Sequence, residues 1–362
     1  MNKVTDLSKI DPKNILIIRL SSIGDTLISA PIAKALKEKY PNAHISWAVD
    51  TNNASIVRAN PYVDRVISIP VTPDFFKRLK KIGIVQMSRE LKRAVREIKE
   101  LNYDLSIDCQ GLYKSSRVAS IAHATVRIGG DNCREGAHRV MTHIAPIAPY
   151  RRVCSKNMDL LKLLGIYENG KPIVVPDEKS AQGCAEFLAE NGIKEKGFAS
   201  FCYAASVPQK DVRNKCWGEL SNKIFEKYGI PSVLFGGPER KENGEEMAKE
   251  YPHILSAAGH FPLMTSIAIA QKGLFAVGVD TGVTWAVFGA NVPLVALYGS
   301  TQVFVQDEED AEYIAHSCPH APCRRRPKCN NEYTCMAAIT ADEIMEKIER
   351  LEPRFTEEPI GE

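Results

Sequence analysis

The strongest constraint on this chain is the alternation of short apolar runs with longer amphipathic stretches. Residues 14–20 (NILIIRL) form a continuous apolar run rich in β-branched side chains, which is typical of a parallel strand buried on both faces. Residues 86–101 instead place Leu91, Val95 and Ile98 on one face of a predicted helix, with charged residues opposite. Strands that alternate with helices in this way predict an α/β fold with a doubly wound parallel sheet.

The alternation restarts in the second half of the chain. Strands are predicted at residues 14–20, 44–49, 65–69, 104–108 and 126–129, and again at 198–203, 232–235, 274–279 and 294–297. A length of 362 residues suits two domains, since a domain averages about 150 residues. We expect a domain at 1–165, a linker at 166–178, a second domain at 179–340 with a Cys-rich loop at 318–335, and a C-terminal helix and tail at 341–362. Thr340 is the expected N-cap of that last helix.

Charge and hydropathy exclude several classes of protein. The chain carries 47 Lys and Arg against 44 Asp and Glu, whereas nucleic-acid binders usually have a strong basic excess, so we expect no nucleic-acid partner. The longest apolar tract, residues 273–299, is interrupted by Asp280, Asn291 and Pro293, so it does not have the pattern of a membrane span. The N-terminus lacks the apolar core of a signal peptide, and we therefore expect a cytoplasmic protein.

The turn after the first predicted strand is a candidate site. Residues 19–25 (RLSSIGD) run from the strand into a helix, and the small residues Ser22 and Gly24 would let a ligand approach the main chain. Asp25 would lie in the first turn of that helix. It could complement the helix dipole, or it could act as a general base that takes a proton from an attacking hydroxyl. The residues alone leave both interpretations open.

The second half repeats this design at residues 277–282 (VGVDTG). Thr281 and Gly282 would open a helix whose main-chain N–H groups suit a diphosphate. Asp280 would repel phosphate, so it would cap the helix, orient the loop or accept bonds from a sugar hydroxyl. In a parallel sheet such ligands bind at the carboxyl ends of the strands, and with two domains we expect the site in the cleft between them.

Other polar residues follow neighbouring strands. Lys215 stands near a predicted helix start and could neutralise phosphate, although an isolated lysine is usually a solvated surface residue. Glu239 follows a Gly-Gly turn and could bind ribose hydroxyls or belong to a plain turn. The basic stretch 75–81 (FFKRLKK) could be a solvated face, contact an anionic membrane or bind a phosphorylated acceptor. Arg134 could line the same side of the expected cleft.

Four of the ten cysteines cluster near the C-terminus. They are spaced C-x4-C-x5-C-x5-C at Cys318, Cys323, Cys329 and Cys335. Four thiols could hold a structural zinc or iron, but the pairs lack the tight spacing of zinc ribbons, so free thiols and a disulfide clip remain alternatives. In each case we expect the group to brace an irregular loop.

Familiar cofactor and metal motifs are missing from the sequence. Residues 165–172 (GIYENGKP) nearly fit the phosphate-binding G-x-x-x-x-G-K-[ST] pattern, but Pro replaces the metal-binding hydroxyl and the segment follows a predicted helix. No G-x-G-x-x-G follows the first strand, and no H-E-x-x-H indicates a catalytic metal.

Five segments together resemble the lipopolysaccharide heptosyltransferases, glycosyltransferase family 9. They are NILIIRLSSIGDTLISAPIAKALKEKYP, DLSIDCQGLYKSSRVA, the Lys-x-Trp of residues 215–217, FGGPE and VGVDTGVTWAVFGANVPLVALYGST, and the tail ending CMAAIT is similar as well. The resemblance implies the GT-B fold, with an N-terminal acceptor domain and a C-terminal nucleotide-sugar domain. It also implies metal-independent, inverting transfer from an ADP-heptose donor to a lipid-linked inner-core sugar, with no required cofactor and a peripheral contact with the inner membrane.

The resemblance also implies roles for individual residues. Asp25 matches the proposed general base, and the donor set comprises Lys215, Ser206, Glu239, Met264, Asp280, Thr281 and Gly282. Lys77, Arg78 and Arg134 lie where family members hold acceptor phosphates, and with Ser22 and Gly24 of the first turn they form the expected acceptor-binding set. The family usually reads D-T-G-x-x-H where this chain has Trp285, whose indole can donate one hydrogen bond but accept none. The tryptophan could instead stack on a different sugar or base. A sugar-nucleotide epimerase and a catalytically decayed binding protein are the alternatives.

Overall fold

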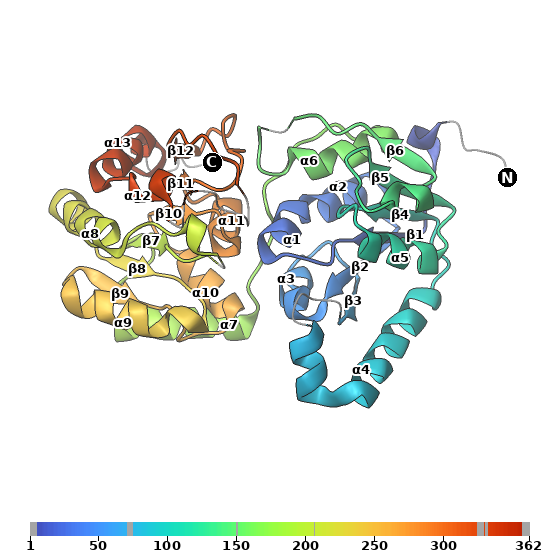
Figure 1. The fold of residues 1–362 in the computed structure, drawn as a ribbon, viewed down its shortest axis with the longest axis horizontal. Coiled ribbons are helices and arrows are strands. Elements are labelled where there is room, and N and C mark those ends of the chain that lie inside the picture. Colours follow the sequence, from blue (N-terminus) through green and yellow to red (C-terminus); the bar gives the residue numbers. More distant parts are fainter. Residues whose placement is uncertain are drawn as a thin grey trace. The chain divides into compact units, whose positions relative to one another are not determined.

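The computed structural model describes residues 6–70, 75–149, 151–205, 207–323, 329 and 332–356, without the side chains of residues 75–79, 81 and 82. The chain divides into two compact units, of which the first comprises Met1–Tyr150 and Cys154–Val175 and the second Arg151–Val153 and Pro176–Glu362. Each unit contains one parallel sheet with helices packed beside it (Figure 1).

The first unit has, in its described residues, a six-stranded sheet with the order β3-β2-β1-β4-β5-β6, and all its pairs are parallel. The strands are β1 (Asn14–Ile18), β2 (His44–Asp50), β3 (Arg65–Ile69), β4 (Leu105–Asp108), β5 (Val126–Gly130) and β6 (His143–Ala145). The helices are α1 (Ile23–Ser29), α2 (Pro31–Lys39), α3 (Ala54–Arg58), α4 (Phe75–Lys99), α5 (Tyr113–Ala122) and α6 (Ser155–Met158). Short 3-10 turns are η1 (Leu7–Lys9), η2 (Thr51–Asn53), η3 (Ala137–Val140) and η4 (Asp159–Leu164).

The second unit repeats this plan. Its described residues form a six-stranded parallel sheet with the order β12-β11-β10-β7-β8-β9. The strands are β7 (Ala199–Cys202), β8 (Ser232–Leu234), β9 (Ile254–Ser256), β10 (Phe275–Val279), β11 (Leu294–Tyr298) and β12 (Ala311–Ala315). The helices are α7 (Glu178–Glu190), α8 (Asn214–Tyr228), α9 (Lys241–Glu250), α10 (Leu263–Ala270), α11 (Gly282–Gly289), α12 (Thr334–Ala337), α13 (Ala341–Leu351) and α14 (Pro353–Thr356), with 3-10 turns η5 (Pro208–Lys210) and η6 (Pro238–Arg240).

Both sheets are held by apolar strands that are covered on both faces. In β1 the consecutive residues Ile15, Leu16, Ile17 and Ile18 are all fully buried, although their side chains alternate between the two faces of the sheet. In the second unit, β7, β10 and β11 are buried along their whole length. Burial on both faces explains the continuous apolar runs, because helices lie on each side of such sheets.

The nine predicted strands correspond to nine observed ones, and the doubly wound fold is confirmed. Strands β6, β9 and β12 were not predicted; they are three to five residues long and stand at edges of the sheets. An edge strand is covered less completely and therefore needs no continuous apolar run. Thr340 is the N-cap of α13, as predicted.

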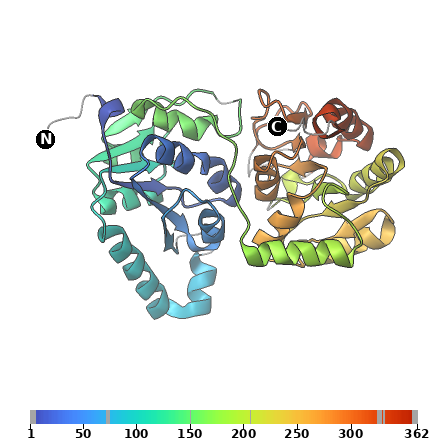
Figure 2. The same ribbon diagram turned by 180° about the vertical axis from the view of Figure 1, so that it is seen from behind.

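Helix α4 differs most from its prediction. The pattern at residues 86–101 predicts only its second half, whereas the observed helix starts at Phe75 and is interrupted at Gly83, which has φ 79° and ψ 162°. Both views show α4 bending and extending beyond the sheet of the first unit (Figures 1 and 2). Ile84 and Val85 follow the bend and are 75% and 62% exposed. Within the described part of the chain, no helix combines the length and apolarity that crossing a bilayer requires.

Candidate active site

Each sheet has a point where the strand order reverses, and the predicted site residues Asp25 and Asp280 follow strands that flank it. In the first sheet the chain leaves β1 toward β2 and β3 and later returns on the other side at β4. In the second sheet β7 and β10 flank the corresponding point. Loops that follow the carboxyl ends of such strands diverge to opposite sides, which leaves room for a ligand. Asp25 follows β1, and Asp280 follows β10.

Asp25 is the third residue of α1, and both of its carboxylate oxygens have partners. Oδ1 lies 2.7 Å from Nη2 of Arg19, while Oδ2 accepts hydrogen bonds from the main-chain N–H and the hydroxyl of Ser22, at 3.3 Å and 3.0 Å. The Asp25 side chain is nevertheless 51% exposed. An ionised carboxylate has about four lone-pair positions, so each oxygen of Asp25 can still accept a further hydrogen bond from a ligand.

The protonation of Asp25 follows from these partners. Partial burial acts to raise the pKa of its carboxyl group, but the Arg19 charge and the two Ser22 hydrogen bonds outweigh that effect. The pKa of Asp25 therefore lies below its ordinary value, and the side chain is an anion at neutral pH. The carboxylate thus supports the start of α1 and remains open to solvent, and its role as a general base stays a prediction.

Arg19 fixes the orientation of Asp25 from inside the sheet. Only 8% of Arg19 is exposed, and its Nη1 donates a 2.5 Å hydrogen bond to the main-chain oxygen of Cys109 at the end of β4. The guanidinium therefore joins the two strands that flank the reversal point. This role of Arg19 was not predicted, because a lone arginine at a strand end gives no signal of its partner.

The loop between β4 and α5 closes this region from the other side. Gln110 accepts a hydrogen bond from the main-chain N–H of Leu20 at 2.9 Å, and Lys114 donates one to the Ser21 hydroxyl at 3.0 Å. Burial lowers the pKa of Lys114, and the Arg19 charge lowers it further against the attraction of Asp50. Gln110 and Lys114 lie in DLSIDCQGLYKSSRVA, a segment that carried the family resemblance without assigned roles.

The predicted acceptor residues are only partly described. Ser22 is exposed and Gly24 is half-buried at the start of α1. The main-chain N–H of Arg134 donates to the oxygen of Gly111 at 2.8 Å, which places this exposed residue beside the β4–α5 loop. The side chains of Lys77 and Arg78 lie outside the described part of the structure.

In the second unit, Asp280 lies directly before Thr281, the N-cap of α11. The Nζ atom of Lys210 lies 2.6 Å from Asp280 Oδ2 and 2.9 Å from the Asp280 main-chain oxygen. The indole Nε1 of Trp285 donates a 3.1 Å hydrogen bond to Asp280 Oδ1. Asp280 therefore orients the loop, and it is not the N-cap residue. Lys210 was missed by the sequence analysis because it stands in the irregular segment between β7 and α8.

Close packing at Gly278 sets the position of this loop. A Cβ atom added at Gly278 would lie 2.4 Å from Oγ1 of Thr284 and 3.0 Å from Cβ of Cys202. Thr284 in turn donates a 2.7 Å hydrogen bond to the oxygen of Val279. Glycine is therefore required here, because it lets α11 pack directly against β10.

Trp285 belongs to the core of its unit. It is 1% exposed, and its ring centroid lies 5.0 Å from that of Phe304 and 6.5 Å from that of Tyr298. The structure overturns the expectation that this ring could stack on a sugar or base, because almost none of its surface is accessible.

The other predicted donor residues are spread over neighbouring loops. Lys215 lies in the first turn of α8 with an 81% exposed side chain, 3.6 Å from Glu219. Glu239 is exposed in η6, and Met264 is half-buried near the start of α10. Ser206 lies outside the described residues. Asp280, Thr281, Gly282 and Trp285 therefore lie together at the end of β10 and the start of α11, whereas Lys215, Glu239 and Met264 lie on α8, η6 and α10.

The C-terminal cysteines do not form a metal centre in the described residues. Cys318, Cys323, Cys329 and Cys335 are free thiols, and no group of three or more His, Cys, Asp or Glu residues described by the structure is placed to hold a metal ion. Burial raises the pKa of the Cys323 and Cys335 thiols. The disulfide clip is likewise not formed among these four residues.

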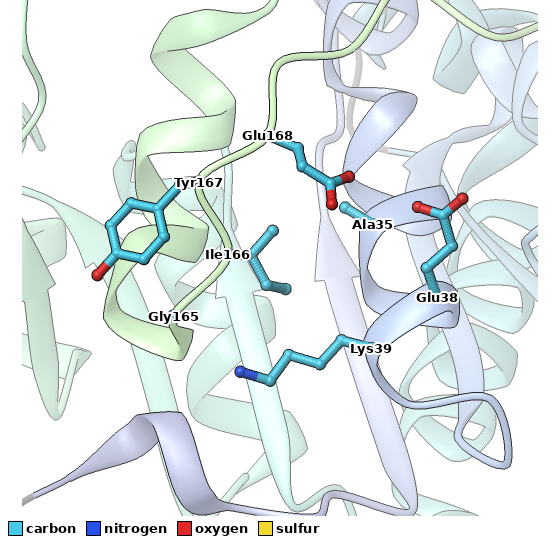
Figure 3. Close-up of a pocket in the computed structure, with 7 residues that line it drawn as sticks. All are labelled: Ala35, Glu38, Lys39, Gly165, Ile166, Tyr167 and Glu168. Atoms are coloured by element: carbon cyan, nitrogen blue, oxygen red, sulfur yellow. The ribbon is translucent and has the colours of Figure 1, made fainter.

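A separate hollow lies near the amino ends of the strands of the first sheet. Its volume is about 520 Å³, and it is lined by the end of α2 and by residues 165–168. Figure 3 shows the carboxylates of Glu38 and Glu168 on one side of this hollow and Lys39 below them. Because α2 returns the chain to the amino ends of the strands, the hollow is remote from the β1–α1 turn and contains none of the predicted site residues.

Comparison with known proteins identifies the family of this chain. The model of glycosyltransferase family 9 (heptosyltransferase) matches residues 91–334. Lipopolysaccharide heptosyltransferase 1 of Escherichia coli K12 is 26% identical over 296 residues, which is 79% of this chain and 88% of that protein.

Two solved structures share the fold over nearly the whole chain. The family 9 glycosyl transferase of Veillonella parvula superposes with a TM-score of 0.77 at 21% identity, covering 95% of this chain and 98% of that one. The E. coli heptosyltransferase WaaC with ADP-2-deoxy-2-fluoro heptose gives a TM-score of 0.70 at 23% identity, covering 93% and 99%.

Proposed function

The chain belongs to glycosyltransferase family 9 and is a glycosyltransferase of the heptosyltransferase type, and from this premise we propose which sugar it transfers and how. The proposed reaction moves a heptose from an ADP-heptose donor to a lipid-linked inner-core sugar of lipopolysaccharide, with inversion at the anomeric carbon and without a catalytic metal. The observation that carries the proposal is the half-exposed, ionised Asp25 carboxylate at the reversal point of the first sheet.

In the proposed mechanism, Asp25 takes the proton of the acceptor hydroxyl as its oxygen attacks the anomeric carbon of the donor. The new C–O bond forms on the face opposite the nucleotide, and the bond from that carbon to the phosphate oxygen breaks. The electron pair leaves with ADP. Asp25 is a weak base because of Arg19, so it accepts the proton late, when the attacking oxygen has become strongly acidic in an oxocarbenium-like transition state.

The second unit supplies the proposed donor site. The main-chain N–H groups at the start of α11 and the dipole of that helix favour the diphosphate, and the ammonium of Lys210 stands beside them at Asp280. The exposed Lys215 side chain is the further cation proposed to contact the diphosphate, and Glu239 and Met264 are proposed to contact ribose and adenine. These groups would stabilise the leaving ADP electrostatically, as a metal ion does in other transferases.

Replacement of Asp25 tests the proposal. Asp25→Asn keeps the size of the side chain and removes its basicity, so we expect transfer from ADP-heptose to fall at least 10³-fold, roughly the contribution of general base catalysis. ADP affinity, measured by calorimetry, should change less than about threefold, since Asp25 lies in the other unit. Full turnover by this variant would remove Asp25 from the mechanism. Wild-type protein that binds ADP but transfers to no acceptor would favour the decayed binding protein.

We also propose that the bend of α4 touches the anionic membrane surface that displays the acceptor. Residues 75–99 contain nine Lys and Arg against two Glu. Ile84 and Val85, at the bend, are the apolar residues that the structure leaves exposed there. Basic side chains beside exposed apolar ones favour anionic lipid, because charge attraction and apolar burial act together. Lys77, Arg78 and Arg134 are the residues proposed to hold acceptor phosphates.

A further inference from the structure

We propose that Trp285 is a positioning residue of the donor site, which acts through its indole N–H on the carboxylate of Asp280. The inference rests on the proposed function, because the loop that Asp280 orients is the proposed site of the donor diphosphate. It gives the departure from the family pattern a definite role, in which Trp285 holds the loop in place from within the core and does not touch the donor.

The carboxylate of Asp280 is held from two sides. Trp285 Nε1 donates to Oδ1 at 3.1 Å, and Lys210 Nζ lies 2.6 Å from Oδ2. The Asp280 side chain is only 13% exposed, so both contacts are largely shielded from water. Hydrogen bonds to an ionised group in such surroundings are stronger than those between neutral groups. Together they determine how the residue before α11 is oriented.

The ring of Trp285 anchors this hydrogen bond. Phe304 and Tyr298 pack against the ring, which is 1% exposed and therefore has little freedom to move. The indole N–H is thus presented from a rigid wall of the core. Lys210 differs in this respect, because its long side chain starts from the end of the short turn η5 and is 21% exposed.

Covalent geometry separates the two contributions of Trp285. In the five-membered ring of indole, Nε1 is two bonds from Cγ, as Nε2 is in imidazole. A histidine at position 285, which the resembled family usually has, can therefore present an N–H at the same point. It lacks the six-membered ring that packs in the core. A phenylalanine has the opposite properties, since it fills much of the space but donates no hydrogen bond.

The test compares Trp285→His with Trp285→Phe. If the N–H positions the loop, Trp285→Phe should weaken ADP binding roughly tenfold, the effect of losing one hydrogen bond to a charged group, while Trp285→His stays within about threefold of the wild type. Melting temperatures should rank in the opposite order, because phenylalanine preserves more apolar packing. ADP affinity is measured by calorimetry and melting by scanning calorimetry.

Trp217→Phe is the matched control. Trp217 is fully buried in the same unit, and its indole Nε1 has no hydrogen-bond partner among the described residues. This variant should lower the melting temperature and leave ADP affinity within about threefold of the wild type. If Trp285→His does not fold, the comparison of Trp285→Phe with Trp217→Phe still decides, because only one of them removes a bonded N–H.

Several outcomes overturn the inference. Trp285→Phe that binds ADP as tightly as Trp285→His, or no more weakly than Trp217→Phe, would show that Trp285 contributes packing alone. Wild-type protein that binds no ADP would instead refute the proposed donor and the inference with it, so the two failures are distinguishable.

Discussion

At the scale of single residues, Arg19 lets the proposed base Asp25 meet two opposing requirements. A general base must be accessible to its substrate, yet a freely moving carboxylate would not be aimed at one. Arg19 is buried between the ends of β1 and β4 and holds one oxygen of Asp25, while Ser22 holds the other. The carboxylate is thereby oriented without being enclosed, at the cost of lower basicity.

This arrangement predicts a pH shift in Arg19→Gln. The Arg19 charge lowers the pKa of Asp25, so its removal should raise that pKa and move the acidic limb of the kcat/KM profile to higher pH. Arg65→Gln is the control, since Arg65 forms an ion pair with Glu100 at 2.5 Å elsewhere in the same unit. An acidic limb that does not move in Arg19→Gln would show that Asp25 is not the titrating base.

The ion pair between Arg19 and Asp25 also predicts how the stability of the protein depends on pH. Because the pKa of Asp25 is lowered in the folded protein, its contribution to stability is present above the unfolded pKa of about 3.9 and is lost as the pH falls through the folded value. The stability difference between wild type and Arg19→Gln should therefore shrink on acidification below that range, as urea titrations at several pH values would measure.

At the scale of elements, α13 shows how local chemistry and packing agree. Thr340 and Glu343 form a reciprocal capping box, in which Glu343 Oε2 accepts from the main-chain N–H of Thr340 at 2.9 Å and Thr340 Oγ1 accepts from the Glu343 N–H at 3.3 Å. The helix then buries Ile344, Ile348 and Leu351 in the core of the second unit. Because the capping residues and the apolar pattern agree, this helix can be identified from its sequence alone.

Thr340→Ala tests the energetic weight of this cap. We expect the free energy of unfolding to fall by about 1 kcal/mol, since the main-chain N–H of Glu343 loses its acceptor. Thr340→Ser preserves the hydroxyl and should retain most of the stability in the same urea denaturation experiment. Equal losses in the two variants would assign the effect to the methyl group.

The bend of α4 makes a second prediction at this scale. Ile84→Asp/Val85→Asp should reduce sedimentation with vesicles containing phosphatidylglycerol by roughly tenfold, since two apolar side chains are lost and two negative charges added. Val175→Asp is the control, because Val175 is 57% exposed in the same unit but lies outside α4. Binding that is the same with phosphatidylcholine vesicles, or unaffected by the double substitution, would refute the membrane contact.

At the scale of the whole molecule, the two units repeat one architecture and carry different chemistry. In each sheet, a strand that flanks the strand-order reversal is followed by an aspartate, but Asp25 is open to solvent and Asp280 is enclosed. In the proposed function, the open carboxylate is the reacting group and the enclosed carboxylate is a supporting group. The proposed transfer thus divides acid–base chemistry and nucleotide binding between the two compact units.

Stabilisation of the folded protein by bound nucleotide tests the proposed donor. ADP at about 100 times its dissociation constant should stabilise the folded protein by about 2.7 kcal/mol, and UDP and GDP at the same concentration should have less effect. The measurement is a thermal-shift panel of nucleoside diphosphates. A larger shift with UDP than with ADP would refute the proposed donor.

Metal independence is tested on the same protein with its substrates. Dialysis against EDTA should leave the transfer rate within about twofold, because the proposed stabilisation of the leaving ADP comes from Lys210, Lys215 and main-chain N–H groups. Loss of transfer that Mg²⁺ or Mn²⁺ restores would contradict this proposal. Metal analysis of the purified protein would separately test a structural ion at the C-terminal cysteines.

The sequence by itself determined the properties that depend on local pattern. Continuous apolar runs predicted the central strands, because a strand covered on both faces must be apolar throughout, and small residues with an aspartate predicted the loops after β1 and β10. The edge strands β6, β9 and β12 escaped prediction, since partly exposed strands carry no such run.

Only the tertiary structure decided which side chains meet. The partners Arg19 and Cys109, or Lys210 and Asp280, are 90 and 70 residues apart in the chain, and no local spacing encodes such contacts. The same is true of Trp285, whose type suggested a stacking surface until its burial showed a core residue with one hydrogen bond to donate. A side chain's type limits its chemistry, but the fold determines whether that chemistry faces the ligand or the interior.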